Sequence, residues 1–216
     1  MHLKRNKIPK EWPVPRKGTK YIAVASHAKT KSIPIVFVLR EILGLVKTNK
    51  EARFMLLNKY VKVNNKTIKD EKFPIRAFDI INLEKTGKNY KLSIVSGKFK
   101  LNEVSGKEAY SKIVKIIGKK ILGKNEIQMN LEDGHNFIVN EKFSTGDSVV
   151  IDNKTNKIEK LLPLKEGANV EIVKGKHAGK KGKLKEIVSL EREKRYYVKL
   201  NEGEVGLPIK TILVIE

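Results

Sequence analysis

The sequence contains no cysteine among its 216 residues. This absence excludes a disulfide framework, a thiolate zinc ribbon, an iron–sulfur site and a cysteine nucleophile. The sequence also lacks any apolar run approaching about 18 residues, and no signal-peptide core follows Met1, so neither a transmembrane helix nor a secretory leader is expected. We therefore expect a cytoplasmic protein with no membrane partner.

Acidic residues are scarce. Lys and Arg number 46 against 24 Asp and Glu, which gives a formal net charge of +22. Self-repulsion of this size is tolerated when a polyanionic partner neutralises it. Because the missing apolar segments disfavour a membrane surface, the composition indicates nucleic acid as the partner.

The excess positive charge is concentrated near the N-terminus. Basic residues number nine against one acidic residue in 1–32 and fifteen against six in 33–100. The numbers are eleven against nine in 101–165 and eleven against eight in 166–216. Seventeen of the 22 net charges therefore lie in the first hundred residues, and we expect that half of the chain to hold the polyanion.

Catalytic and metal-binding patterns are also missing. No two of the histidines lie at metal-ligand spacing, and the glycines form neither a P-loop nor a dinucleotide-binding motif. The histidines are His2, His27, His135 and His177. Asp79 and Asp147 directly precede strand-like runs, where turn and backbone-capping roles are usual. We expect no enzyme activity, no cofactor, no metal and no small-molecule substrate.

Residues 1–32 form a basic arm interrupted by Pro9, Pro13 and Pro15. The arm has no sustained apolar period, so it buries too little surface to fold alone. We expect it to become ordered on a phosphate surface, with Trp12 able to stack or wedge; a solvated basic tail is the alternative. The candidate RNA contacts are Lys4, Arg5, Lys7, Lys10, Trp12, Arg16, Lys17 and Lys20.

An α+β pattern follows the arm. Apolar residues recur at three and four positions over residues 35–46, which predicts a helix. Thr48 and Glu51 form a capping box that predicts the start of a second helix. Strand-like runs follow, and the first of them turns at Asn64 and Asn65, as in a β-hairpin.

Basic side chains of this segment form a candidate RNA-binding patch that contains Arg40, Lys50, Arg53 and Lys62. Lys50 and Arg53 are three residues apart and share one face of the second helix. Because the apolar helix faces need one another, the basic residues remain outside, where they can meet phosphates. A merely soluble helix surface is the alternative, and it is weakened by the scarcity of acids on these faces.

Short strand-like runs separated by turn signals make up most of the chain beyond Gly97, which indicates a small barrel. One exception is the segment 106–117, where Ala109, Ile113 and Ile116 repeat at three and four positions and predict a short helix. The last fifty residues restart the strand pattern and predict another compact barrel of about five strands.

The last segment contains the glycine-rich string VKGKHAGKKGK. Its glycines allow turns with positive φ and close approach of another backbone, so the loop can lie against a phosphodiester chain or a ribosomal protein. A plain glycine-containing hairpin is the alternative. The candidate loop residues are Gly175, Lys176, His177, Gly179, Lys180 and Gly182.

Four strings in this order carry a resemblance to a known family. They are MHLKRNKIPKEWPVPRKGTKY, SIPIVFVLREILGL, EARFMLLNKYVKVNNKTIKDEKFPIRAFDIINLEKT and VKGKHAGKKGKLKEI. Together they resemble the archaeal and eukaryotic-type small-subunit ribosomal protein family S-four-e (S4e) over essentially the whole chain.

The resemblance implies four parts: a basic N-terminal extension (1–32), an S-four-type RNA-binding domain (33–100), a central β domain (101–165) and a C-terminal KOW domain of SH3-like barrel form (166–216). The implied fold class is α+β, multi-domain and mostly β. By position, Arg40, Lys50 and Arg53 fall in the helical RNA-contacting part, and Gly182 is the signature glycine of the KOW loop. The implied partners are small-subunit rRNA and neighbouring ribosomal proteins in the cytoplasm.

An RNA-modifying enzyme and a transcription elongation factor are the alternatives to a structural role in the ribosome. An RNA-modifying enzyme with an S-four-type domain, such as a pseudouridine synthase or a methyltransferase, needs a catalytic domain with a dedicated Asp or a cofactor-binding glycine loop. The residues after position 100 contain neither. A transcription elongation factor with a KOW domain leaves the basic arm and the helix pair unexplained. The sequence therefore favours a structural protein of the small ribosomal subunit that supports subunit assembly and translation.

Overall fold

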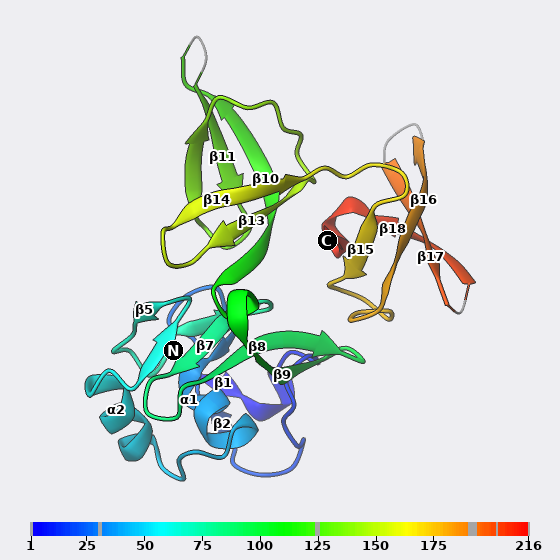
Figure 1. The fold of residues 1–216 in the computed structure, drawn as a ribbon. Coiled ribbons are helices and arrows are strands. Elements are labelled where there is room, and N and C mark those ends of the chain that lie inside the picture. Colours follow the sequence, from blue (N-terminus) through cyan, green and yellow to red (C-terminus); the bar gives the residue numbers. More distant parts are fainter. Residues whose placement is uncertain (1, 30–31, 124–125, 190–193, 202, 216) are drawn as a thin grey trace. The chain divides into compact units, whose positions relative to one another are not determined.

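Strands dominate the architecture (Figure 1). The structure is a computed structural model that describes residues 2–29, 32–123, 126–189, 194–201 and 203–215. Within these residues the strands form five separate sheets and the helices are short, which confirms the predicted mostly β, multi-sheet character. The chain divides into two compact units, Met1–Lys112 and Ile113–Glu216, which are called here the N-terminal unit and the C-terminal unit.

The first predicted helix is shorter than its apolar pattern suggested. The helix α1 (Ile35–Phe37) runs directly into a π-helical turn (Val38–Ile42). Gly44 then has a φ of +63°, a backbone conformation that glycine adopts without strain. All side chains from Ile35 to Leu39 are buried, so this short segment forms part of the core of the N-terminal unit.

The second helix begins where the capping box predicted. In α2 (Asn49–Leu57), the Thr48 hydroxyl accepts a hydrogen bond from the Glu51 N–H at 3.2 Å. The Glu51 carboxylate accepts one from the Lys47 N–H at 2.8 Å, and this bond is the main reason why the pKa of Glu51 is lowered. The Glu51 N–H, a donor of the first helical turn, and the Lys47 N–H, a donor that precedes the helix, are thereby satisfied.

A five-stranded antiparallel sheet with the order β5-β4-β7-β8-β9 completes the α+β part. Its strands are β4 (Val61–Val63), β5 (Lys66–Thr67), β7 (Ile80–Leu83), β8 (Lys88–Val95) and β9 (Lys98–Val104). Asn64 and Asn65 join β4 to β5 with φ values of +50° and +62°, which confirms the predicted hairpin turn. A separate pair is formed by β3 (Ser32–Pro34) and β6 (Pro74–Arg76).

The basic arm (1–32) packs against the rest of the N-terminal unit, which differs from the expectation that it becomes ordered on a phosphate surface. Its strands β1 (Leu3–Lys4) and β2 (Tyr21–Ile22) pair with each other. Trp12 is 4% exposed and packs on Phe37 with ring centroids 5.6 Å apart. The arm finds its apolar partners in α1 rather than within itself, and so the lack of an internal period did not reveal its burial.

A second five-stranded sheet, with the order β12-β11-β10-β13-β14, begins at the boundary of the two units. Its strands are β10 (Ser111–Ile121), β11 (Ile127–Leu131), β12 (Asn136–Val139), β13 (Ser148–Asp152) and β14 (Lys157–Leu162). The predicted helix over 106–117 is wrong beyond the single 3-10 turn Gly106–Ala109. Ile113, Val114 and Ile116 are β-branched residues, which lose side-chain freedom in a helix and suit a strand.

The C-terminal sheet has the order β18-β17-β16-β15-β19. Its strands are β15 (Asn169–Ile172), β16 (Lys181–Ser189), β17 (Lys194–Leu200), β18 (Gly203–Pro208) and β19 (Ile212–Val214). Val150 and Leu162 of the preceding sheet share one hydrophobic core with Val170, Leu184 and Val198. The two sheets of the C-terminal unit are therefore packed together.

Lys115 joins these two sheets from within. Its ammonium group, on β10, donates hydrogen bonds to the carbonyl oxygens of Ile209 and Ile212, the latter at 2.6 Å. The residue is 7% exposed, and burial lowers the pKa of Lys115 from its ordinary value of 10.5 to about 8. A neutral amine keeps two N–H donors, so both bonds survive loss of the proton.

The stability of the C-terminal unit should therefore rise with pH in the alkaline range. Between the two pKa values of Lys115 the unfolded chain binds more protons at this site than the folded chain. The gain in the free energy of unfolding that comes from Lys115 is complete above the ordinary pKa of 10.5, and it is lost as the pH falls to about 8. Between about pH 8 and 9.5 it should add about 1.5 kcal/mol to the free energy of unfolding.

Calorimetric unfolding at pH 8 and 9.5 measures this rise, with Lys115→Met as the matched variant. The variant has no titrating group at this position, so its unfolding should gain about 1.5 kcal/mol less over the same interval. Identical pH profiles for the two proteins would show that Lys115 is not the titrating group.

Candidate nucleic-acid interface

The two units differ sharply in charge. The N-terminal unit carries 26 basic and 9 acidic residues, a balance of +17, whereas the C-terminal unit carries 20 and 15, a balance of +5. A polyanion is therefore attracted mainly to the N-terminal unit.

The exposed face of α2 combines cations with large apolar side chains. Lys50, Arg53, Phe54 and Leu57 are spaced at three, four and seven residues and so lie on one side of the helix. Phe54 is 62% and Leu57 58% exposed, whereas Ala52 on the opposite side is buried. Within the described part of the chain, the Lys50 and Arg53 side chains have no acidic partner. This surface, called here the α2 face, can contact phosphates and the flat faces of sugars or bases.

The sequence patterns did not identify Phe54 and Leu57 as candidate binding residues. Their signal is present in the sequence: once Ala52 and Leu56 are taken as the buried positions, both residues lie off the buried stripe. An exposed pair of large apolar residues next to two cations is typical of a binding surface.

Arg40 and Lys62 are already engaged within the protein. The Arg40 guanidinium donates to the Glu41 carboxylate at 2.9 Å and to the Asn49 side-chain oxygen at 2.8 Å. Lys62 forms a 2.6 Å ion pair with Glu84. Of the four predicted patch residues, the structure brings Lys50 and Arg53 together on the α2 face, and it gives the other two acidic partners.

The predicted arm contacts fall into two groups. Six cations have exposed side chains: Lys4, Lys7, Lys10, Arg16, Lys17 and Lys20. Arg5 instead clamps the arm, because its guanidinium donates to the carbonyl oxygens of Thr19 and Pro15, both at 2.7 Å. The buried Trp12 is a core residue and offers no exposed ring for stacking, which corrects that expectation.

Most of the predicted KOW loop lies between β15 and β16, and its last residue, Gly182, lies within β16. Gly175 and Gly179 have φ values of +93° and +88°, so both use the freedom of glycine. A Cβ atom at Gly182 would lie 2.5 Å from the Lys199 carbonyl oxygen, so this glycine allows close packing on β17. Lys176 is exposed and His177 is half-buried. The Lys180 side chain takes part in an interaction within the protein.

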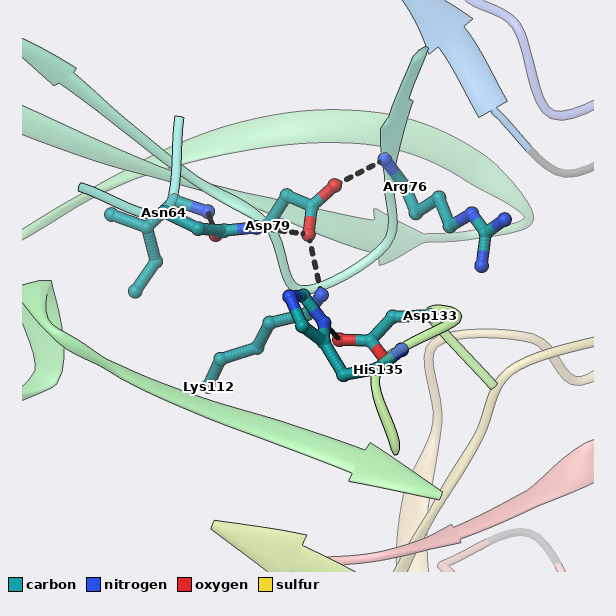
Figure 2. A network of polar contacts seen from close by, with 7 residues as sticks. Asn64, Arg76, Asp79, Lys112, Asp133 and His135 are labelled. Carbon is teal, nitrogen blue, oxygen red and sulfur yellow. Dashed lines mark hydrogen bonds and ion pairs between the residues drawn. The ribbon is translucent and has the colours of Figure 1, made fainter. Parts of the chain in front are cut away.

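Asp79 and Asp147 serve structural roles. Figure 2 shows the Asp79 carboxylate accepting hydrogen bonds from the Arg76 N–H at 2.7 Å and the Asn64 amide at 2.8 Å, and pairing with the Lys112 ammonium at 2.7 Å. Asp147 caps backbone N–H groups at Ser144 and Leu164. The capping roles predicted for these two aspartates are confirmed.

The histidines form no metal site within the described residues, where no cluster of three or more metal-ligating side chains occurs. In the turn between β11 and β12, His135 Nδ1 lies 2.9 Å from the Asp133 carboxylate (Figure 2). His27 packs edge-on against Phe73, and His2 against Tyr21.

Comparison with known proteins adds an independent observation. The family described as "Ribosomal family S4e" matches residues 86–158. The chain is 37% identical to the small ribosomal subunit protein eS4 of Methanosphaera stadtmanae over 95% of its own length and 86% of that protein. It is 34% identical to the protein of the same name from Nanoarchaeum equitans, over 95% and 90% of the two chains.

A solved structure is similar as well. The crystal structure of the 30S ribosomal protein S4e from Thermoplasma acidophilum superposes with a TM-score of 0.74 at 26% identity. The match covers 86% of this chain and 95% of that one. The sequence similarity and the fold similarity therefore extend over most of the length of both chains.

Proposed function

The chain belongs to the ribosomal S4e family, and from this premise we propose that it is a structural constituent of the small ribosomal subunit that binds rRNA. Membership rests on relatives that match this chain over almost its whole length. Proteins of this family are structural parts of the ribosome and not enzymes, so the proposed role is assembly and support of the subunit during translation.

The observation that carries the RNA-binding proposal is the unequal charge of the two units. The α2 face and the exposed lysines of the arm belong to the unit with a balance of +17. Each phosphate that such a cation neutralises releases counterions from the RNA, which favours binding. We infer that the N-terminal unit makes most of the phosphate contacts.

We further propose the four-part division named above: the extension 1–32, an S-four-type domain over 33–100, a central β domain over 101–165 and a KOW domain over 166–216. The helices and hairpin in 33–100 and the five-stranded sheet after residue 166 support it. The KOW loop residues 175–182 are proposed as a secondary contact to RNA or to a neighbouring ribosomal protein.

The alternatives weighed from the sequence receive no support. The relatives that match over almost the whole length are named as small ribosomal subunit proteins, not as elongation factors or RNA-modifying enzymes. The proposed location is therefore the ribosome in the cytoplasm, with rRNA and ribosomal proteins as partners. Among the described residues, no helix is long and apolar enough to span a membrane.

Co-sedimentation tests this function. The epitope-tagged chain, expressed in the organism from which the sequence comes, should sediment with small subunits through a high-salt gradient. Quantitative mass spectrometry should find one copy per subunit. Recovery of the chain at the top of the gradient, or at far below one copy per subunit, would overturn the proposal.

A further inference from the structure

A cavity of about 540 Å³ opens within the N-terminal unit, between the basic arm and the helical segment that starts at Ile35. Its lining combines an apolar part, formed by residues such as Ile22, Val36 and Phe37, with a charged part. The charged lining consists of Arg5, Lys17, Arg40, Lys72, Glu41 and Glu71. A cavity of this volume suits a small organic group rather than a single ion or water.

One carboxylate that lines this cavity, that of Glu71, has no partner among the residues that the structure describes. Glu41 is held by the Arg40 guanidinium at 2.9 Å. The Glu71 side chain is half-buried, and across the described ranges of the chain it receives no hydrogen bond and forms no ion pair. A partly desolvated carboxylate without a donor is unfavourable, so the site is suited to a ligand that donates N–H or O–H groups.

An exposed aromatic ring lies at the same cavity. Tyr21 is 47% exposed and lines the cavity from β2. The Lys20 ammonium lies 5.4 Å from the centre of its ring. Exposed tyrosines beside cations are the usual platform on which proteins stack single-stranded bases.

We propose that this cavity accepts one unstacked nucleobase of the bound RNA, with Tyr21 stacked on the base and Glu71 accepting its N–H groups. The inference rests on the proposed RNA-binding function and adds a specific contact to it. Guanine fits best, because its N1–H and N2–H groups are neighbouring donors that match the two oxygens of one carboxylate. The exposed Lys17 and Lys72 ammonium groups are placed to meet the flanking phosphates.

The charge pattern disfavours a free anion as the occupant. A phosphate ion inside the cavity would meet the Glu71 carboxylate, whereas a base presents donors to it and leaves the phosphates near the lysines. A base pocket therefore gives the Glu71 carboxylate, which has no partner among the described residues, a role beside the four cations of the lining.

The variant Glu71→Gln distinguishes the base pocket from a purely electrostatic role of Glu71, because the two predict opposite changes in RNA affinity. Removing a negative charge should strengthen binding to a polyanion, whereas losing the acceptor pair should weaken it. We expect Glu71→Gln to bind a small-subunit rRNA transcript about 10-fold or more weakly, with an unchanged salt dependence. Tyr21→Leu should bind about 5- to 150-fold more weakly.

Glu108→Gln is the matched control, because Glu108 is an exposed acid of the same unit that does not line the cavity. It should bind the transcript as tightly as the unchanged protein or slightly more tightly. Binding of Glu71→Gln that equals that of Glu108→Gln, with normal binding by the unchanged protein, overturns the base pocket and leaves the proposed function standing. Failure of the unchanged protein to bind rRNA overturns the proposed function itself.

Folding of the variants is checked by urea unfolding followed through Trp12 fluorescence. If Glu71→Gln unfolds early, the unchanged full chain is titrated instead with guanosine 5′-monophosphate and, separately, with inorganic phosphate. Amide NMR shifts at Tyr21, Ala23 and Lys72 with the nucleotide alone support the pocket. Equal shifts with phosphate, or none with the nucleotide at millimolar concentration, overturn it.

Discussion

Replacing Asp79 by Ala should lower the free energy of unfolding of the N-terminal unit by about 3 to 5 kcal/mol. The substitution removes the carboxylate that lies 2.7 Å from the Lys112 ammonium, in an ion pair whose two side chains are both 5% exposed. The Arg76 N–H and the Asn64 amide would lose their acceptor as well. Trp12 is the single tryptophan of the sequence and is buried in this unit, so its fluorescence during urea unfolding reports on this unit.

Two further variants make the test specific. Glu84→Gln breaks the more exposed ion pair with Lys62 and should cost no more than about 1 kcal/mol. The double variant Asp79→Asn with Lys112→Met removes both buried charges and should recover more than half of the loss. Asp79, which precedes β7, binds the side chain of Asn64, which follows β4. If Asp79→Ala lowered the free energy of unfolding no more than Glu84→Gln does, the buried contacts of Asp79 would not stabilise the N-terminal unit.

Replacing Lys50 and Arg53 together by Gln should weaken rRNA binding by about 25- to 60-fold at 0.1 M salt. Each lost phosphate contact removes about 0.7 to 0.9 from the slope of log affinity against log salt, so the slope should become about 1.4 to 1.8 less steep. Gln has a helix propensity close to that of Lys and Arg, so α2 should remain folded. Titrations of an rRNA transcript at several salt concentrations measure both quantities.

Lys142→Gln with Lys157→Gln is the matched control, because both lysines are exposed in the C-terminal unit. This variant removes the same number of charges from the protein. Its salt slope should change by less than half as much as that of the α2 variant. Equal losses of slope would mean that the charge excess of the N-terminal unit does not locate the RNA surface.

Local sequence signals predicted local structure well. The capping box at Thr48 and Glu51 and the hairpin turn at Asn64 and Asn65 involve residues within three positions of one another, so their chemistry is visible in a short string. The mostly β character also follows from short-range patterns. The segment 106–117 was mistaken for a helix, because its three- and four-residue repeat coincided with a run of β-branched residues that favours a strand.

Contacts between distant residues could not be predicted in the same way. Trp12 is buried by Phe37, and Lys115 bonds to carbonyl oxygens 94 and 97 residues further along the chain. No pattern in the sequence around Trp12 or Lys115 indicates which residue each of them contacts. The candidate site shows the same division: Lys50 and Arg53 are visible as a helix face, whereas the cavity beside Glu71 requires the arm to fold against α1.

Lysine acylation of the chain within native small subunits, compared with the free chain, tests whether the N-terminal unit holds the rRNA. We expect Lys4, Lys7 and Lys50 of the N-terminal unit to lose most of their reactivity in the subunit, because phosphates cover them. The exposed lysines of the C-terminal unit, Lys120, Lys142 and Lys157, should retain more of theirs. Equal protection in the two sets, or stronger protection in the C-terminal set, would show that the N-terminal unit is not the main RNA-binding surface.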